Sequence, residues 1–314
     1  MIDFFSKWYA TIQNNNTFLE KYRIYSVHRV FVRVLANILL SIYFRCTSRN
    51  SQYKLIENKK NDGRIIVSLT SFPARINKVW MVVESMLRQT HKPDMIILWL
   101  SNEQFSSLNV LPKNLLDLQS RGLRIELKDE DLRSHKKYYY AMKEYPDDFI
   151  ITIDDDIFYR KNMISNLIKY SEKFPNAIIA QYTRRVVKYK QVLSSYSKWS
   201  DVYGEDTICN NLFFGSGGGT LFPTNSLYKD CLKTELFMNL SSLADDLWLN
   251  AMARLNKRRV IKTNASPLIL PIINKNNTTL SSVNRDQNMN DVQIENIRNY
   301  YKKELGIDPF KYKE

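Results

Sequence analysis

Short apolar segments alternate with amphipathic helical segments from Ile65 to Ile153, and this alternation limits the fold more than any other feature of the chain. The predicted strands cover 65–70, 95–100, 123–127 and 149–153, and the helices between them cover 79–87, 111–118 and 134–144. Strands connected in this way form a mostly parallel, Rossmann-like α/β sheet with helices on both faces. Ligands of such sheets bind at the carboxyl ends of the strands, where Thr70 and Asp154 are expected.

Three consecutive carboxylates, Asp154, Asp155 and Asp156, directly follow the strand that ends at Ile153. Adjacent like charges raise each other's pKa unless a cation lies among them, so we expect a divalent metal site. Because strand side chains alternate, Asp154 and Asp156 are predicted to share a face as a D-x-D pair, with Asp155 pointing away. The alternative is an acidic turn that caps a helix over 161–173.

A glycine-rich segment is the second unusual feature, since four of the eight glycines lie between Gly215 and Gly219. Such a concentration indicates unusual backbone dihedrals or a close approach of another group. The spacing matches neither a Walker loop nor a dinucleotide fingerprint. We therefore predict that Gly217, Gly218 and Gly219 lie against a sugar, in preference to forming a flexible linker.

A second acidic pair, Asp245 and Asp246, opens a predicted helix. Ser242 and Asp245 have the spacing of a capping box, which would explain Asp245 as a helix cap. This interpretation leaves Asp246 free. A carboxylate at the rim of a site can act as a general base, so Asp246 is our first candidate for that role and Asp245 the second.

Two basic segments have open interpretations. The run from Arg133 to Lys137, which includes His135, contacts a diphosphate or is an exposed helix start. The tyrosine-rich basic stretch 183–198 binds nucleic acid or forms a hairpin beside a sugar site. We favour the sugar site and expect no nucleic-acid partner, because no recognisable nucleic-acid module accompanies the stretch.

Positive charge is concentrated near the N-terminus. The chain has a net charge of +14, and residues 1–63 carry 10 Lys and Arg against 4 Asp and Glu, or +6. Within them Val30–Phe44 is a predicted helix in which Arg33, Asn37 and Ser41 share one face. The segment is too short and too interrupted to predict a membrane span. It lies on an anionic leaflet, which we favour, or packs on the core of the protein.

Three parts of the chain follow from these patterns: a basic N-terminal helical extension over 1–63, an α/β domain over 64–270, and a polar loop with a C-terminal helix over 271–314. The loop is either a lid or a disordered segment. Three scattered cysteines predict neither disulfides nor a zinc site, and no signal-peptide pattern is found. We expect a cytoplasmic protein, at the inner face of the membrane if its N-terminal helix binds lipid.

Taken in order, these motifs resemble a GT-A-fold nucleotide-sugar glycosyltransferase, similar to family 2-like enzymes of bacterial capsule and lipopolysaccharide gene clusters. The most specific parts are Leu69–Arg75 and Ile153–Tyr159, and the resemblance spans about residues 64–262. It implies transfer of a sugar, first of all from a UDP-sugar, to a hydroxyl of a glycan acceptor, with inversion. A lipid-linked acceptor would suit the basic N-terminus.

The resemblance also implies site residues. The nucleotide would lie near Thr70, Ser71 and Arg75, and Mg²⁺ or Mn²⁺ on the diphosphate would be held by Asp154 and Asp156. Gly217 to Gly219 would face the donor sugar or the acceptor. Asp246 would match the base of the family's x-E-D pattern, with Asp245 where the family often has Glu. As further donor-binding candidates we add Lys136, Lys137 and Asp155.

Two other functions remain compatible with parts of the sequence. A metal-dependent nucleotidyltransferase would also place carboxylates and a metal near a nucleotide, but Thr70 to Arg75 lacks the glycines of its phosphate loop. A basic peripheral-membrane or nucleic-acid binding protein without catalysis would explain the net charge.

Overall fold

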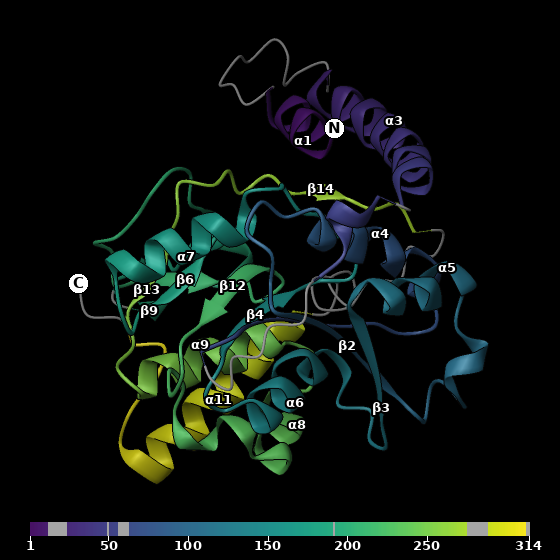
Figure 1. The fold of residues 1–314 in the computed structure, drawn as a ribbon. Helices are drawn as coiled ribbons and strands as arrows, with labels where there is room; N and C mark the ends of the chain where they lie inside the picture. Colours follow the sequence, from purple (N-terminus) through teal and green to yellow (C-terminus); the bar gives the residue numbers. More distant parts are fainter. Residues whose placement is uncertain (12–23, 49, 56–62, 191, 275–287, 312–314) are drawn as a thin grey trace.

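The computed structural model describes residues 1–11, 24–48, 50–55, 63–190, 192–274 and 288–311. A seven-stranded sheet runs through its centre in the order β13-β6-β12-β4-β1-β2-β3 (Figure 1). The strands are β1 Ile65–Thr70, β2 Met95–Ser101, β3 Leu123–Lys128, β4 Phe149–Ile153, β6 Ile178–Ala180, β12 Gly218–Phe222 and β13 Val260–Lys262. Strand β12 is antiparallel to β4 and β6, and the other pairs are parallel. The predicted mostly parallel sheet is confirmed.

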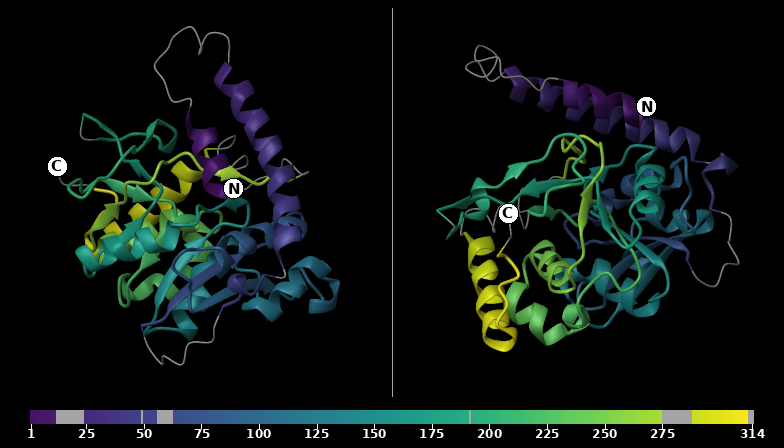
Figure 2. Two further views of the ribbon diagram at one scale, coloured as in Figure 1. Left: turned by 45° about the horizontal axis from the view of Figure 1, so that its top comes forward. Right: turned by 90° about the vertical axis from the view of Figure 1, so that its left-hand side faces the viewer.

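Helices cover both faces of this sheet (Figures 1 and 2). On one side lie α4 Ile76–Leu87 and α7 Met163–Lys173, and on the other lie α6 Lys136–Glu144, α8 Thr234–Ser241, α9 Asp245–Leu255 and α11 Met289–Leu305. The alternation of strand side chains explains the two layers, since Val67 and Leu69 of β1 join the core with α4. Ile66 points the other way and packs with Trp99 and Ala141 of α6.

A smaller antiparallel sheet lies beside the large one. It has the order β10-β7-β11, formed by Ser200–Asp201, Thr183–Arg185 and Leu212–Phe214. Because β11 precedes β12 in the chain, the glycine-rich segment connects the two sheets. The remaining strands are two short pairs, β5 Ile157–Phe158 with β14 Leu270–Pro271, and β8 Lys188–Tyr189 with β9 Val192–Leu193.

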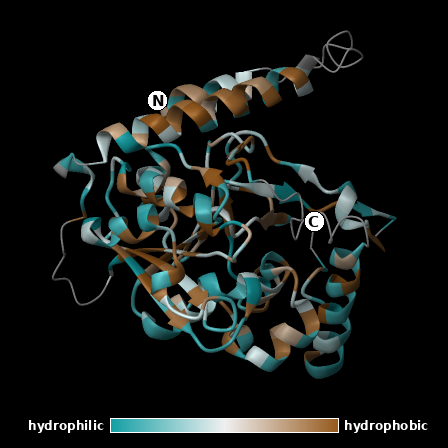
Figure 3. Ribbon diagram, turned by 90° about the vertical axis from the view of Figure 1, so that its right-hand side faces the viewer, coloured by the Kyte–Doolittle hydropathy of each residue, from teal (hydrophilic) through white to brown (hydrophobic). Residues whose placement is uncertain are grey.

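Two N-terminal helices, α1 Ile2–Thr11 and α3 Ile24–Thr47, lie side by side across the domain (Figure 2). Helix α3 buries one stripe completely, formed by Val32, Ala36, Leu40 and Phe44, so it packs on the core. Its other side exposes large apolar residues, coloured brown in Figure 3: Val27, Val30, Phe31, Val34, Ile38, Leu39 and Ile42. Within the described residues, Tyr25–Thr47 is the one segment long and apolar enough to cross a membrane.

Several predicted boundaries were wrong. Helix α4 begins at Ile76, earlier than the predicted helix over 79–87, because the Arg75 and Ile76 N–H groups already donate to the Phe72 carbonyl in the turn before it. The helix expected over 111–118 is a single turn, α5 Lys113–Leu116, followed by a 3₁₀ helix. Helix α3 extends beyond the predicted Val30–Phe44.

The polar face predicted for the N-terminal helix has a structural partner. The Asn37 side chain donates to the Pro271 carbonyl at 3.1 Å and accepts from Ile273 N–H at 2.9 Å. The predicted packing of this helix on the protein is therefore confirmed, whereas its binding to an anionic leaflet stays a prediction for the exposed side. Residues 56–62 of the predicted N-terminal extension and residues 275–287 of the predicted polar loop lie outside the described residues.

Candidate active site

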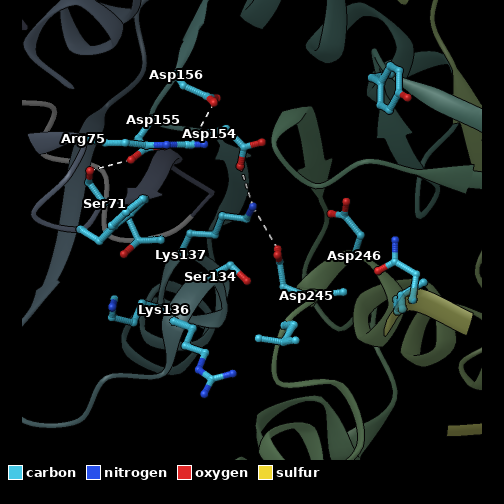
Figure 4. A pocket seen from close by; sticks show the side chains of 18 of the residues that line it. Ser71, Arg75, Ser134, Lys136, Lys137, Asp154, Asp155, Asp156, Asp245 and Asp246 are labelled. Carbon is cyan, nitrogen blue, oxygen red and sulfur yellow. Dashed lines mark hydrogen bonds and ion pairs between the residues drawn. The ribbon is translucent and has the colours of Figure 1, made fainter. Parts of the chain in front are cut away.

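A pocket of about 990 Å³ opens at the carboxyl ends of β1 and β4 (Figure 4). Most of the candidate residues from the sequence line it: Thr70, Ser71, Arg75, Lys136, Lys137, Asp154, Asp155, Asp156, Asp245 and Asp246. The sheet explains this arrangement, because β1 and β4 are parallel neighbours and their carboxyl ends lie at one edge.

Asp155 is the most enclosed member of the acidic triplet. Its Oδ2 accepts a hydrogen bond from Ser71 Oγ at 2.6 Å, and its Oδ1 lies 2.7 Å from Arg75 Nη1. Strand β4 ends at Ile153, so side-chain alternation does not extend into the triplet. Asp155 therefore does not point away from the site as alternation predicted. It anchors Arg75 beside the two flanking carboxylates.

Asp156 lies near the same arginine, with its Oδ2 at 2.9 Å from Arg75 Nη1. Burial and the negative charge of Asp154 raise the pKa of Asp156 to about 7, against the lowering effect of Arg75. The raised pKa indicates that the negative charges of these carboxylates repel one another. A bound cation would relieve this repulsion. Helix capping does not explain the triplet, because α7 begins only at Met163.

Asp154 is the most exposed of the three carboxylates, at 42% of its side chain. Its position is set from behind by Tyr159, whose hydroxyl oxygen accepts from Asp154 N–H at 2.8 Å and whose O–H donates to the Gly217 carbonyl. A Cβ on Gly217 would overlap the Asp154 carboxylate. Only glycine at this position allows the observed orientation of Asp154.

Lys137 joins the two acidic groups across the floor of the pocket. Its Nζ lies 2.8 Å from Asp154 Oδ1 and 3.0 Å from Asp245 Oδ2, and the side chain is almost fully buried. Burial alone would lower the pKa of Lys137, but Asp154, Asp245 and Asp246 together raise it, so the lysine is charged.

The adjacent residues Asp245 and Asp246 have opposite electrostatic environments. Burial acts to raise the pKa of Asp245, but Lys137, His135 and the Ser216 hydroxyl, 2.6 Å from Oδ2, hold it below its usual value. Burial and the neighbouring charge of Asp245 raise the pKa of Asp246 to about 7. Its Oδ1 accepts from Ser216 N–H at 2.7 Å. A pair whose pKa values are pushed apart in this way is typical of acid–base chemistry.

The capping-box explanation of Asp245 was wrong. Helix α9 has Ala244 at its N-cap and no side-chain cap, and the Asp245 carboxylate points instead to Lys137 and Ser216. Only part of the basic run from Arg133 to Lys137 matches its predicted place, and its contact with a diphosphate stays a prediction. Lys136 and Lys137 line the pocket, whereas His135 is fully buried, stacks on Phe237 at 4.4 Å and meets the Ser241 carbonyl through Nε2 at 2.8 Å.

The three candidate glycines lie behind the pocket and are not among its lining residues. A Cβ on Gly218 would come within 2.5 Å of Tyr182 Cβ, and Gly219 has φ of +93° and lies against Met163. These glycines act on the site through the side chains packed on them, Asp154 on Gly217 and Tyr182 on Gly218. Their proposed direct contact with a sugar remains a prediction.

Four further residues, which no sequence pattern singled out, also line the pocket: Tyr182, Arg184, Tyr196 and Asp201. Three of them lie in or next to the basic, tyrosine-rich stretch for which a sugar site was favoured, so composition gave a partial signal. Their convergence depends on pairing of β7 with β10 and β11. That pairing has no local signature in the sequence.

A metal ion would find hard oxygen ligands here. Asp154 and Asp156 line the pocket with carboxylates that suit Mg²⁺ or Mn²⁺, which commonly take one or two protein carboxylates and complete their shell with water and substrate phosphate. Among the described residues, no group of three or more His, Cys, Asp or Glu side chains has the arrangement of an all-protein metal cage. The donor set therefore fits a cation shared with a diphosphate.

Comparison with known proteins identifies a family for the domain. Residues 75–230 match the family model described as glycosyl transferase family 2. No curated protein sequence matches the chain.

Three similar solved structures illustrate the fold. The mannosyltransferase PcManGT from Pyrobaculum calidifontis, in complex with GDP-Man and Mn²⁺, is 10% identical, with 90% of this chain and 77% of that chain covered and a TM-score of 0.48. TarS 1–349 from S. aureus in complex with UDP is 12% identical, with 78% and 72% covered and a TM-score of 0.41. A 4-diphosphocytidyl-2C-methyl-D-erythritol synthase is 12% identical, with 71% and 98% covered and a TM-score of 0.39. Since each TM-score is below 0.5, we base no argument on these likenesses.

The family match spans the acidic triplet and the glycine-rich segment, the two features that set the geometry of the pocket. The resemblance inferred from the sequence is thereby confirmed: the chain is a family 2-like glycosyltransferase with a GT-A-like α/β fold.

Proposed function

We propose that this glycosyltransferase moves a sugar from a nucleoside-diphosphate donor, with a UDP-sugar as the first candidate, to a hydroxyl of a glycan acceptor with inversion. One observation carries the proposal. Asp246, with its pKa raised to about 7, borders the same pocket as the Asp154–Asp156 turn, and Lys137 lies between them (Figure 4). A base and a diphosphate site that share one pocket are what direct displacement at an anomeric carbon requires.

The charged side chains at the ends of β1 and β4 define the donor half of the pocket. The nucleotide would lie near Thr70, Ser71 and Arg75, and Asp154 and Asp156 would hold the Mg²⁺ or Mn²⁺ of the diphosphate. A bound cation supplies positive charge that stabilises the leaving nucleoside diphosphate. Arg75 and Lys137 add fixed positive charge at the same place, and their burial strengthens that contribution.

Lys136 and Asp155 support the donor half without direct chemistry. Lys136 Nζ pairs with Asp131 at the pocket edge, and Asp155 holds Ser71 and Arg75 in place. Asp245 has the corresponding task on the other side, since it fixes Lys137 and the Ser216 hydroxyl.

The reacting proton is assigned to Asp246. The acceptor hydroxyl oxygen attacks the anomeric carbon and forms the new C–O bond, while the bond from that carbon to the diphosphate oxygen breaks. The hydroxyl proton passes to the Asp246 carboxylate, and the electron pair of the broken bond leaves with the nucleoside diphosphate. A single displacement with the base on the acceptor side inverts the anomeric configuration.

The N-terminal helices extend the proposal to location. The exposed side of α1 and α3 carries large apolar residues, and Lys7 and Arg45 are exposed on the same two helices. Apolar side chains flanked by basic ones are the composition of an interfacial helix on an anionic leaflet. We assign the protein to the cytoplasmic face of the membrane, where a lipid-linked acceptor in capsule or lipopolysaccharide synthesis would be within reach.

Vesicle flotation tests this location. The chain should bind vesicles of phosphatidylcholine with phosphatidylglycerol, bind less at high salt, and lose binding when Phe31 and Ile38 are both changed to Asp. Tyr203→Asp, an exposed change outside these helices, serves as the control. Unchanged binding of the Phe31 and Ile38 variant would remove the membrane assignment.

A thermal-shift screen of nucleotide sugars with and without Mn²⁺ tests the chemistry. A ligand selective for the folded state raises the apparent stability, so at least one UDP- or GDP-sugar should raise the melting temperature more with Mn²⁺ than without it. Product analysis with that donor should give nucleoside diphosphate. Release of a sugar phosphate, with transfer of the nucleoside monophosphate, would instead support a nucleotidyltransferase, and no shift with any donor would contradict the proposal.

A further inference from the structure

The pocket lining includes a cluster of aromatic and charged side chains to which the proposed function gives no task. Tyr182, Arg184, Tyr196 and Asp201 all line the pocket that Asp246 borders. They come from β7, β10 and the segments beside them, which form a separate sheet. The cluster therefore has its own scaffold, distinct from the strand ends that hold the donor half.

Internal contacts hold this cluster together. The Tyr182 hydroxyl donates to Asp201 Oδ1 at 2.9 Å, and the Arg184 guanidinium lies 4.7 Å from the centre of the Tyr196 ring. Arg184 Nε is also 3.7 Å from Asp201 Oδ1. Tyr196 is fixed at its own backbone, because its N–H donates to Asp291 of α11 at 2.7 Å. The two rings are thus held in position before any ligand binds.

The cluster is close to the reacting groups. Burial first, and the Asp246 carboxylate second, raise the pKa of Tyr196, so the phenol and the proposed base border the same space. Tyr182 packs on the glycine-rich segment, where Gly215 and Gly218 lack the Cβ atoms that would come within 2.6 and 2.5 Å of it. Three consecutive residues of that segment therefore contact the proposed base, the acidic triplet and the cluster in turn. Ser216 donates a hydrogen bond to Asp246, Gly217 lies against Asp154, and Gly218 lies against Tyr182.

We propose that Tyr182, Arg184, Tyr196 and Asp201 form the acceptor subsite, which binds a sugar ring of the glycan with one hydroxyl directed to Asp246. Sugars present apolar C–H faces and polar hydroxyl edges. The rings of Tyr182 and Tyr196 offer apolar surface for the first, and Asp201 and Arg184 offer an acceptor and a donor of hydrogen bonds for the second. This combination of aromatic walls with a few placed polar groups is typical of small-molecule sites.

The inference rests on the proposed function and names the part of the pocket that selects the acceptor. Asp201 is paired with Tyr182, and its side chain is still 38% exposed, so an oxygen remains open to a sugar hydroxyl. A site built to bond a hydroxyl discriminates strongly against analogues that lack it. The expected acceptor is therefore a glycoside whose ring hydroxyls reach Asp201. Its binding should not depend on which nucleotide the donor carries.

Steady-state kinetics on the full chain test this assignment, with Mn²⁺ and the donor found in the thermal-shift screen. The probes are the methyl glycosides of glucose, galactose, N-acetylglucosamine and mannose. The variants are Tyr196→Ala and Asp201→Asn, with Tyr189→Ala as a matched control because Tyr189 is exposed and outside the pocket. Nucleotide release is measured with and without glycoside, which separates transfer from hydrolysis of the donor.

The two pocket variants should raise the acceptor KM about tenfold or more, because Tyr196→Ala removes the proposed apolar contact with the sugar ring and Asp201→Asn removes the charged acceptor for a sugar hydroxyl. The melting-temperature shift caused by the donor should stay at its wild-type value in both variants. The control should match wild type throughout. If these residues only stabilised the fold, their loss would weaken donor binding as well as acceptor binding. A change in the acceptor KM alone therefore indicates direct contact with the acceptor.

Two results would overturn the assignment. Acceptor KM values within twofold of wild type in both variants would show that the acceptor binds elsewhere, and the proposed function would remain. Equal losses of donor binding and acceptor binding would assign the cluster to the donor. Absence of any stimulation by the four glycosides in the wild-type chain also counts against a sugar-binding cluster. Failure of the donor itself to bind would contradict the proposed function as well.

Discussion

The two halves of the pocket are built in different ways. In the donor half, Thr70, Ser71 and Asp154 follow directly on the carboxyl ends of β1 and β4, two parallel neighbours of the large sheet. In the acceptor half, which comprises the proposed acceptor subsite and Asp246, the side chains come from a small antiparallel sheet, the segments beside it and the start of α9. The comparison indicates that the fold fixes the donor half and that more local pairing fixes the acceptor half.

One short segment joins the halves. Ser216 contacts both aspartates of α9, whereas Gly217 and Gly218 face Asp154 and Tyr182. Lys137 makes a second connection through its ion pairs with Asp154 and Asp245. If the two halves have separate tasks, changes on either side of these connections should have separable effects.

The largest effect is expected from Asp154→Ala in the donor half. Loss of one of the two proposed metal-binding carboxylates should lower turnover about a thousandfold, since it weakens binding of the cation that would stabilise the leaving group. Titration of Mn²⁺ followed by electron paramagnetic resonance should show weaker binding. Asp147→Ala is the control, because Asp147 is exposed and outside the pocket. Wild-type Mn²⁺ affinity in Asp154→Ala would show that the cation binds elsewhere.

Lys137→Met should break the connection between the halves and destabilise the fold. Removal of the buried ammonium leaves Asp154 and Asp245 without their shared partner, which costs about 3–5 kcal/mol of unfolding free energy. Urea denaturation measures the change. Lys78→Met, at an exposed position on α4, should cost much less. Similar losses in both variants would mean that the Lys137 ion pairs contribute little.

Gly217→Ala and Gly218→Ala compare the halves directly, since the two residues are neighbours in the chain. A Cβ on Gly217 displaces Asp154 and should weaken Mn²⁺ binding about tenfold, whereas a Cβ on Gly218 displaces Tyr182 and should instead raise the acceptor KM. Both quantities are measured in both variants. Identical profiles would contradict the division of the pocket.

The dependence of kcat on pH should be a smaller effect, and it should arise from Asp246 in the acceptor half. Asp246 must lose its proton to act as a base, and its pKa is raised to about 7. At saturating Mn²⁺, kcat should therefore fall about tenfold for each pH unit below 7 and level off above it. A profile measured from pH 5.5 to 8.5 tests this. A flat profile would assign the proton to another group.

The difference between the halves also explains what the sequence predicted. The strands 65–70 and 149–153 have strong local patterns, so the carboxyl ends that carry Thr70 and Asp154 were placed correctly. Asp155 was oriented wrongly, because alternation stops where the strand stops. His135 was considered for a diphosphate although it is buried on Phe237, a contact across about 100 residues that no local pattern encodes.

Most residues of the acceptor half could not be predicted from the sequence, because they also depend on contacts between distant segments. Tyr196 reaches the pocket through a bond between its backbone and Asp291, and Tyr182 through packing on Gly215 and Gly218. These contacts join distant segments with no periodic signal. The glycine-rich composition indicated that something packs closely there, but not that the neighbours are an aspartate and a tyrosine of the protein itself.

The most direct test of the account is Asp246→Asn, compared with wild type for kcat and for the melting-temperature shift caused by donor and Mn²⁺. Loss of a general base should lower kcat between about a hundredfold and ten-thousandfold. The donor-dependent shift should persist, because Ser71, Arg75 and the acidic triplet are unchanged. Near-normal turnover in Asp246→Asn would contradict the assignment of Asp246 as the base that activates the acceptor.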